Sequence, residues 1–192
     1  MTQENEPLLN PRESLALIME IITLTRENLK QHSFIFLLWG WLLAVASIAR
    51  FILESFTDVL YYFLPFPILA AVGAVVTILH YRPARKQQPE THLNDFIKKL
   101  WLVLSVGLIV CVFTSVYQGN VPFTYTMILA GIGTLLTGLV MKFNPLLFGG
   151  IWFLVSSVYS VFLPDEYKVL VHGMAIIIGF LIPGYLLKNA KP

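Results

Sequence analysis

The residues of this chain that could carry chemistry are four histidines and a small number of carboxylates. His80, Glu90, His92 and Asp95 fall within one short stretch between two apolar runs. Imidazole nitrogens and carboxylate oxygens together bind divalent metals. The stretch contains no pair of ligands at the helical spacing i, i+4, and polar loops often carry such residues without a ligand. We therefore expect neither a metal site nor a cofactor.

Two further groups of ionisable residues fall near the ends of apolar runs rather than at their centres. Arg50 and Glu54 stand one helical turn apart, and His172 follows Asp165 and Glu166. We expect both groups to lie at a membrane interface. A charged side chain at the centre of a bilayer costs at least ~2.5 kcal/mol, so coupled transporters place one there for a purpose. Because no apolar run has such a residue near its centre, the sequence argues against coupled transport.

No stretch of the sequence carries a catalytic motif. There is no Gly-x-Ser-x-Gly elbow and no His-Glu-x-x-His pair, and Gly131-Ile132-Gly133 lies inside an apolar run rather than after a strand. The single cysteine, Cys111, excludes an intramolecular disulfide and a cysteine zinc cluster. The net charge of +2 gives no reason to expect nucleic-acid binding. We expect no enzyme activity.

The elements that would position these residues are six long apolar runs. The composition is 57% hydrophobic and 12% charged, whereas about a quarter of the residues in soluble domains are charged. A helix crosses the hydrocarbon core of a bilayer with about 20 apolar residues. The sequence thus predicts an all-α polytopic membrane bundle over residues 33–188, with a kink at Pro65 and Pro67 and an interruption at Pro183-Gly184. The expected spans are 33–53, 58–81, 96–117, 122–141, 146–163 and 168–187.

The basic residues are distributed unequally between the two sides of this arrangement. Eleven of the thirteen Lys and Arg residues fall on the side of the two termini, and only Arg50 and Lys168 fall on the other. In short loops an excess of Lys and Arg marks the cytoplasmic side. We expect both termini to be cytoplasmic, in a membrane protein with lipid as its surroundings.

Residues 1–32 form a polar leader with an expected helix over 11–31. Asn10 can cap this helix, Pro11 suits its first position, and Glu13 can complete a capping box. Three glutamates balance three basic residues along it, so anionic lipid gains little from it. We expect its apolar stripe to dock a protein, which could be the loops of the same chain, a second copy or a soluble partner, with lipid as the competing surface. The stripe consists of Leu15, Ile18, Met19, Ile22 and Leu29.

Small residues mark the expected helix contacts, because small side chains let membrane helices approach closely. Their surface could serve packing within the chain or a homo-oligomer. The second, fourth and sixth spans also share the pattern Gly-x3-(Thr/Pro)-x4-(Lys/Arg). Three pseudo-repeated hairpins would explain this pattern, and so would chance similarity among apolar helices. The residues expected at helix contacts are Gly73, Gly131, Gly133, Thr137 and Gly138.

The chain resembles an uncharacterised family of small bacterial multi-pass inner-membrane proteins. The resemblance rests on Glu13-Ser14-Leu15-Ala16-Leu17-Ile18, Phe36-Leu37-Leu38-Trp39-Gly40, Thr137-Gly138, Lys142-Phe143-Asn144-Pro145-Leu146 and Ile182-Pro183-Gly184-Tyr185. It implies a fold and a bacterial inner-membrane location, and no activity or site. On the residues alone we expect a non-enzymatic membrane protein whose leader helix docks a partner. The alternative is a small-solute transporter or channel that uses the proline-broken second and sixth spans.

Overall fold

The computed structural model describes the backbone of residues 11–57, 60–84 and 92–190, and the side chains of 32–57, 60–81 and 93–190. Every element within these ranges is helical. The elements are α1 (Pro11–Phe56), α2 (Pro65–Ala84), α3 (His92–Tyr117), α4 (Phe123–Met141), α5 (Asn144–Val161), α6 (Asp165–Ile176), the π-helical segment η1 (Ile177–Leu181) and α7 (Ile182–Asn189).

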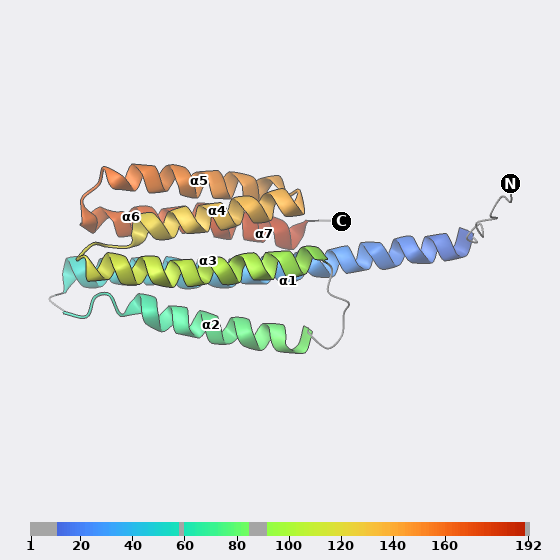
Figure 1. Cartoon of the computed structure of the whole chain (residues 1–192), viewed down its shortest axis with the longest axis horizontal. Helices are drawn as coiled ribbons and strands as arrows, with labels where there is room; N and C mark the ends of the chain where they lie inside the picture. The colour runs from blue at the N-terminus through green and yellow to red at the C-terminus, as the bar shows by residue number, and fades with distance from the viewer. Residues whose placement is uncertain (1–10, 58–59, 85–91, 191–192) are drawn as a thin grey trace.

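Helix α1 is one continuous helix of 46 residues. The sequence predicted two helices, over 11–31 and 33–53, and the structure joins them without a break. The part before His32, here called the extension, projects beyond all the other helices (Figure 1). Its 21 residues span about 32 Å at a rise of 1.5 Å per residue. The amphipathic character of the extension stays a prediction, since its side chains lie outside the described ones.

The bundle has two ends, which we name from α1. The near end is the one at His32, where the extension leaves the bundle, and the far end carries the connecting residues 60–64, 118–122 and 162–164. With α6, η1 and α7 taken as one continuous segment, successive helices run in alternating directions between these ends, so α7 finishes at the near end (Figure 1). This alternation is the one expected of a polytopic membrane protein.

Five helices of the described chain are long and apolar enough to cross a membrane, and α2 is the shorter apolar one. The five are His32–Phe56, Leu93–Tyr117, Phe123–Met141, Asn144–Val161 and Asp165–Asn189. Apolar side chains cover their outer surfaces, above all on α3, where Leu102, Val103 and Ile109 are exposed. An apolar surface of this extent is unfavourable in contact with water and favourable in contact with hydrocarbon. The fold is therefore a membrane-embedded helical bundle.

The start of α2 differs from the prediction. The expected span began at residue 58 with a kink at its prolines, but α2 begins at Pro65 and the preceding residues form turns. Proline suits the first position of a helix, because its missing N–H would have no partner there. Pro65 therefore starts a helix rather than bending one.

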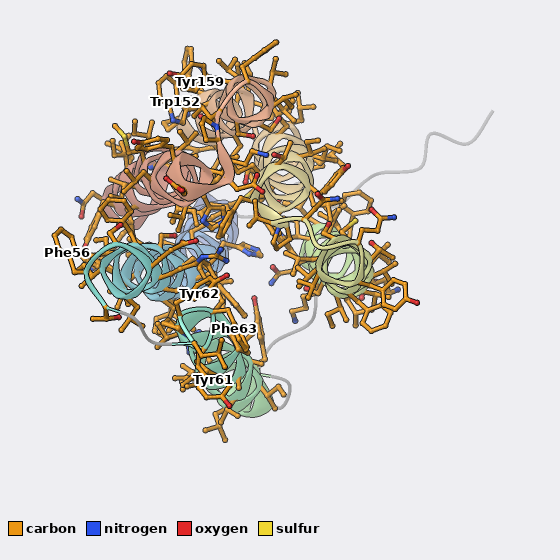
Figure 2. The ribbon with its side chains drawn as sticks, turned by 90° about the vertical axis from the view of Figure 1, so that its left-hand side faces the viewer. Phe56, Tyr61, Tyr62, Phe63, Trp152 and Tyr159 are labelled. Carbon is orange, nitrogen blue, oxygen red and sulfur yellow. The ribbon has the colours of Figure 1, made fainter. Side chains whose placement is uncertain are left out.

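Helix α1 lies centrally and packs against α2, α6, η1 and α7, while α4 packs against α3 and very closely against α5. Viewed along the bundle, α2 and α3 lie at its edge (Figure 2). Aromatic and large apolar residues form the shared core, with Met127, Leu146 and Phe153 among its most buried members.

Two tight turns use the same cap. After α3, Gly119 has φ +75° and Asn120 N–H donates to Ser115 O at 2.9 Å, which is a Schellman motif. After α4, Lys142 takes the equivalent left-handed position with φ 51°, and Phe143 N–H donates to Gly138 O at 2.9 Å. The sequence predicted turns at both places. A lysine in this conformation costs roughly 1–2 kcal/mol that glycine avoids.

The expected interruption of the last span takes the form of η1. Pro183 has no N–H and its ring clashes with the carbonyl four residues earlier, so the helix widens to a π-turn just before it. Pro183 is buried, and its ring lies where a side chain on Gly149 of α5 would stand. The interruption is therefore packed against a neighbouring helix.

Candidate functional site

A buried arginine is the most unusual polar feature of the bundle. Arg50 of α1 is only 7% exposed, although the sequence predicted an interfacial residue. It stands six residues before the end of α1, so it lies about 9 Å inside the far end. Its Nε donates to Glu54 Oε2 at 3.3 Å, so the predicted pairing of these two residues is confirmed, while their position at a membrane interface stays a prediction.

Aromatic rings surround the guanidinium of Arg50. Its Cζ lies 5.2 Å from the ring centroid of Tyr62, in the turns before α2, and 4.8 Å from that of Phe123, at the start of α4. The ring faces carry partial negative charge and attract a cation, which is worth about 2 kcal/mol or more when water is excluded. Three elements thus meet around one positive charge.

His172 belongs to the same cluster. It lies on α6, is only 5% exposed, and its Nδ1 is 3.0 Å from Ser47 Oγ. Its ring contacts those of Phe66 and Phe123 at centroid distances of 5.7 and 5.0 Å. The sequence predicted an interfacial histidine with Asp165 and Glu166 nearby; its depth in the membrane stays a prediction, and its side chain is buried within the bundle. His172 faces α1, because its helix packs against that element.

A signal for this cluster is present in the sequence. Ser47, Arg50 and Glu54 continue the 3/4 spacing of Phe36 and Leu43, which line one face of α1. A polar residue on the same stripe as core residues is expected to be buried with them. The position of Arg50 near the end of an apolar run concealed this, because distance along a helix does not indicate which face a residue occupies.

The near end has a second group of polar contacts. His32 Nε2 lies 2.5 Å from Asn94 Oδ1, and the two residues join α1 to α3. His80 stacks on Phe34 at 4.2 Å between ring centroids, and Lys98 Nζ lies 5.3 Å from the Tyr81 ring. These contacts tie α2 and α3 to α1 where the three helices meet.

The metal-ligand candidates of the sequence do not form a site among the described residues. Glu90 and the side chain of His92 lie outside them. Asp95 pairs with Lys99 at 2.7 Å, and His80 is engaged with Phe34. In the part of the chain that the structure describes, no three His, Cys, Asp or Glu residues are grouped so that they could hold a metal.

Two hairpins share one interhelical contact. Trp39 Nε1–H of α1 donates to Thr77 Oγ1 of α2 at 3.2 Å, and the indole lies where a side chain on Gly73 would stand. Trp101 Nε1–H of α3 donates to Thr137 Oγ1 of α4 at 3.1 Å, with its indole against Gly133. In each hairpin the threonine hydroxyl also donates to the carbonyl of that glycine at 2.7 Å.

The third hairpin departs from this contact in a consistent way. Pro183 stands where the threonine would be, and proline offers no hydroxyl. The facing residue on α5 is Gly149, beside both Pro183 and Gly179, so no indole requires an acceptor there. The shared sequence pattern thus corresponds to a shared contact in two hairpins and to backbone packing in the third.

The remaining expected packing residues lie between α4 and α5. A side chain on Gly131 would meet Leu154 at 2.9 Å and Gly150 O at 3.1 Å, and one on Gly138 would meet the backbone N of Leu147 at 2.8 Å. These glycines therefore allow a close approach of α4 and α5. The expected docking stripe, Leu15, Ile18, Met19, Ile22 and Leu29, lies on the extension, outside the described side chains.

Comparisons with known protein families, with curated proteins and with solved structures found no match to this chain. The fold and the charge-bearing core define the class on their own: a membrane-embedded helical bundle with a long helical extension at one end.

Proposed function

We propose that this chain is a non-enzymatic docking protein of the bacterial inner membrane, with six crossings, two cytoplasmic termini and an extension that binds a soluble protein partner. The observation that carries the proposal is the continuity of α1 past the near end of the bundle (Figure 1). A helix rigidly joined to a membrane bundle presents its surface at a fixed place in the aqueous phase.

The sixth crossing is α2. Helix α1 ends at the far end and α3 begins at the near end, so the chain between them must return through the full depth of the bundle (Figure 1). The 20 residues of α2 extend about 30 Å, which matches the hydrocarbon thickness. Its apolar part, Pro65–Tyr81, is shorter than the other spans, and this is consistent with a helix at the edge of the bundle.

The distribution of basic residues supports the orientation. The far end carries Arg50, which is paired with Glu54, and Lys168, which is paired with Asp165 at 2.7 Å. The other eleven basic residues fall on the near side in the sequence. Positive charge remains on the cytoplasmic side of a membrane, so the extension would project into the cytoplasm.

The helical phase of α1 favours a soluble partner over a second copy. With 3.6 residues per turn, positions 15, 18, 22 and 29 fall on the same face of a continuous helix as the buried His32 and Phe36. That face is the one against which the bundle itself packs. If two copies joined their extensions along it, about an axis normal to the membrane, their bundles would compete for the same space. A soluble protein beneath the near end has no such conflict.

The transporter alternative receives less support. Pro65 begins α2 at the far end, and Pro183 lies six positions before the end of α7 at the near end. The two prolines therefore do not share a site. Pro183 is moreover packed against Gly149, where a substrate would need open space.

In-cell photo-crosslinking tests the docking proposal. We expect a photoreactive residue at Ile18 or Ile22 to give one discrete adduct with a soluble protein. Glu20 and Glu27, on the opposite face of the same helix, are the matched control positions and should give none. An adduct with the mass of a dimer would assign the stripe to a second copy. Equal crosslinking at all four positions would contradict a docking face.

A further inference from the structure

We propose that Arg50 is the binding group of a site for a phosphate, carried by a lipid headgroup or by a small solute, at the far end of the bundle. This inference is independent of the extension. It starts from the hydrogen-bonding capacity of the guanidinium, which has five N–H donors on three nitrogens.

One nitrogen of Arg50 is occupied and two are free. Nε donates to Glu54 Oε2 at 3.3 Å, and this is a single contact rather than the paired arrangement that guanidinium and carboxylate usually form. Among the residues that the structure describes, the two terminal nitrogens donate no hydrogen bond. A charged donor that is largely shielded from water is costly without an acceptor, so this edge favours an added acceptor.

Solvent can reach this edge. Within the described chain, every fully enclosed polar side-chain atom has a hydrogen-bond partner. The terminal nitrogens of Arg50 have none, so they are not fully enclosed even though the residue as a whole is 7% exposed. The rings of Tyr62 and Phe123 contact the guanidinium through their faces, which leaves its edge as the direction of approach.

The geometry points to a phosphate because of the arrangement of the two terminal nitrogens of Arg50 and their position along α1. Two parallel N–H groups match two oxygens of one phosphorus. The site lies about 9 Å inside the end of α1, near the level at which lipid phosphates meet the hydrocarbon. The ring of His172 contacts Phe123, as Arg50 does, and its Nε2 could add a further donor or acceptor to a ligand held there.

Glu54 allows a sharp test, because removing its carboxylate should have different effects if Arg50 only stabilises the fold and if Arg50 binds a phosphate. If Arg50 serves only the fold, Glu54 is its stabilising partner, and its loss changes stability alone. If Arg50 holds a phosphate, Glu54 competes for the guanidinium and repels the ligand, so Glu54→Gln strengthens phosphate binding. Lys168 is the other basic residue of the far end, and its exposed pair with Asp165 makes Lys168→Gln the matched control.

The test uses the full chain purified in dodecylmaltoside, a detergent without phosphate. One arm adds phosphatidylglycerol and counts bound lipid by native mass spectrometry. The other titrates inorganic phosphate and follows its ³¹P resonance. We expect wild type to bind at least one probe, Arg50→Gln to weaken binding by about tenfold or more, and Lys168→Gln to change it less than about twofold. Binding of the lipid alone or of inorganic phosphate alone identifies the source of the phosphate.

Arg50→Lys and Glu54→Gln keep the test decisive if Arg50→Gln does not fold. Lysine retains the charge without the fork, so Arg50→Lys should lose part of the affinity, and Glu54→Gln should gain affinity. The proposal is overturned if wild type binds neither probe, if Arg50→Gln and Lys168→Gln weaken binding equally, or if Glu54→Gln leaves binding unchanged.

Discussion

Thr137 connects two helices through one oxygen atom. Its hydroxyl accepts the indole N–H of Trp101 at 3.1 Å and donates to Gly133 O, and the residue is fully buried. An indole N–H without an acceptor in an apolar interior loses the hydrogen bond it would make elsewhere. The hydrogen bond between Trp101 and Thr137 therefore stabilises the α3–α4 hairpin in addition to the packing of the two side chains.

Thr137→Val tests this contact, because valine keeps the shape and removes the oxygen. We expect a loss of about 1–3 kcal/mol in the free energy of unfolding, measured by denaturant titration in detergent. Thr134→Val is the matched control, since Thr134 is equally buried on α4 and donates only to Ala130 O of its own helix.

A double-mutant cycle with Trp101→Phe completes this test. Phenylalanine needs no acceptor, so the combined loss should be smaller than the sum of the two single losses. Equal losses for Thr137→Val and Thr134→Val, or full additivity with Trp101→Phe, would show that the indole does not depend on the threonine.

At the scale of elements, the α4–α5 contact depends on glycine. A Cβ on Gly138 would lie 2.8 Å from the backbone N of Leu147, and backbone cannot move aside as a side-chain end can. Gly107 of α3 offers the comparison, because the nearest atom to a Cβ there is 4.0 Å away.

We expect Gly138→Ala to destabilise the protein by roughly 1–3 kcal/mol through overpacking. Gly107→Ala should be neutral, or stabilising by up to about 1 kcal/mol, because alanine favours a helix more than glycine does. Thermal unfolding of both variants in one detergent measures the difference. If the two variants unfold at the same temperature, the close approach of α4 and α5 is not required.

The helical class and the position of most spans could be predicted from the sequence. A helix surrounded by hydrocarbon needs an apolar run long enough to cross it, so the runs mark the helices. The boundary expected near residue 32 could not, since hydropathy changes there while the backbone meets no glycine or proline to end the helix. Pro65 was interpreted as a kink for the related reason that a proline inside an apolar run and one at a helix start look alike in sequence.

The candidate site was predicted less well than the fold. The pairing of Arg50 with Glu54 follows from their spacing, but the burial of Arg50 depends on Tyr62, Phe123 and the packing of α6. Such contacts depend on how helices rotate against each other, which no local pattern specifies. Thr137 was likewise predicted as a packing residue without its tryptophan donor.

At the scale of the whole molecule, the proposals depend on how the bundle lies in a bilayer. Alternating helices place the connections at residues 118–122 and 162–164 at the far end, and the end of α7 at the near end with the extension (Figure 1). If the near end is cytoplasmic, the extension meets soluble partners and Arg50 faces the opposite leaflet. The two proposed sites would then operate on opposite sides of the membrane.

Cysteine accessibility in intact cells tests this arrangement most directly. In a Cys111→Ala background, a membrane-impermeant maleimide should label Asn120→Cys and Pro164→Cys from outside. It should label Gln88→Cys and Lys191→Cys only after lysis. The reverse pattern, or labelling of Gln88→Cys and Asn120→Cys from the same side, would contradict the six-crossing bundle with cytoplasmic termini.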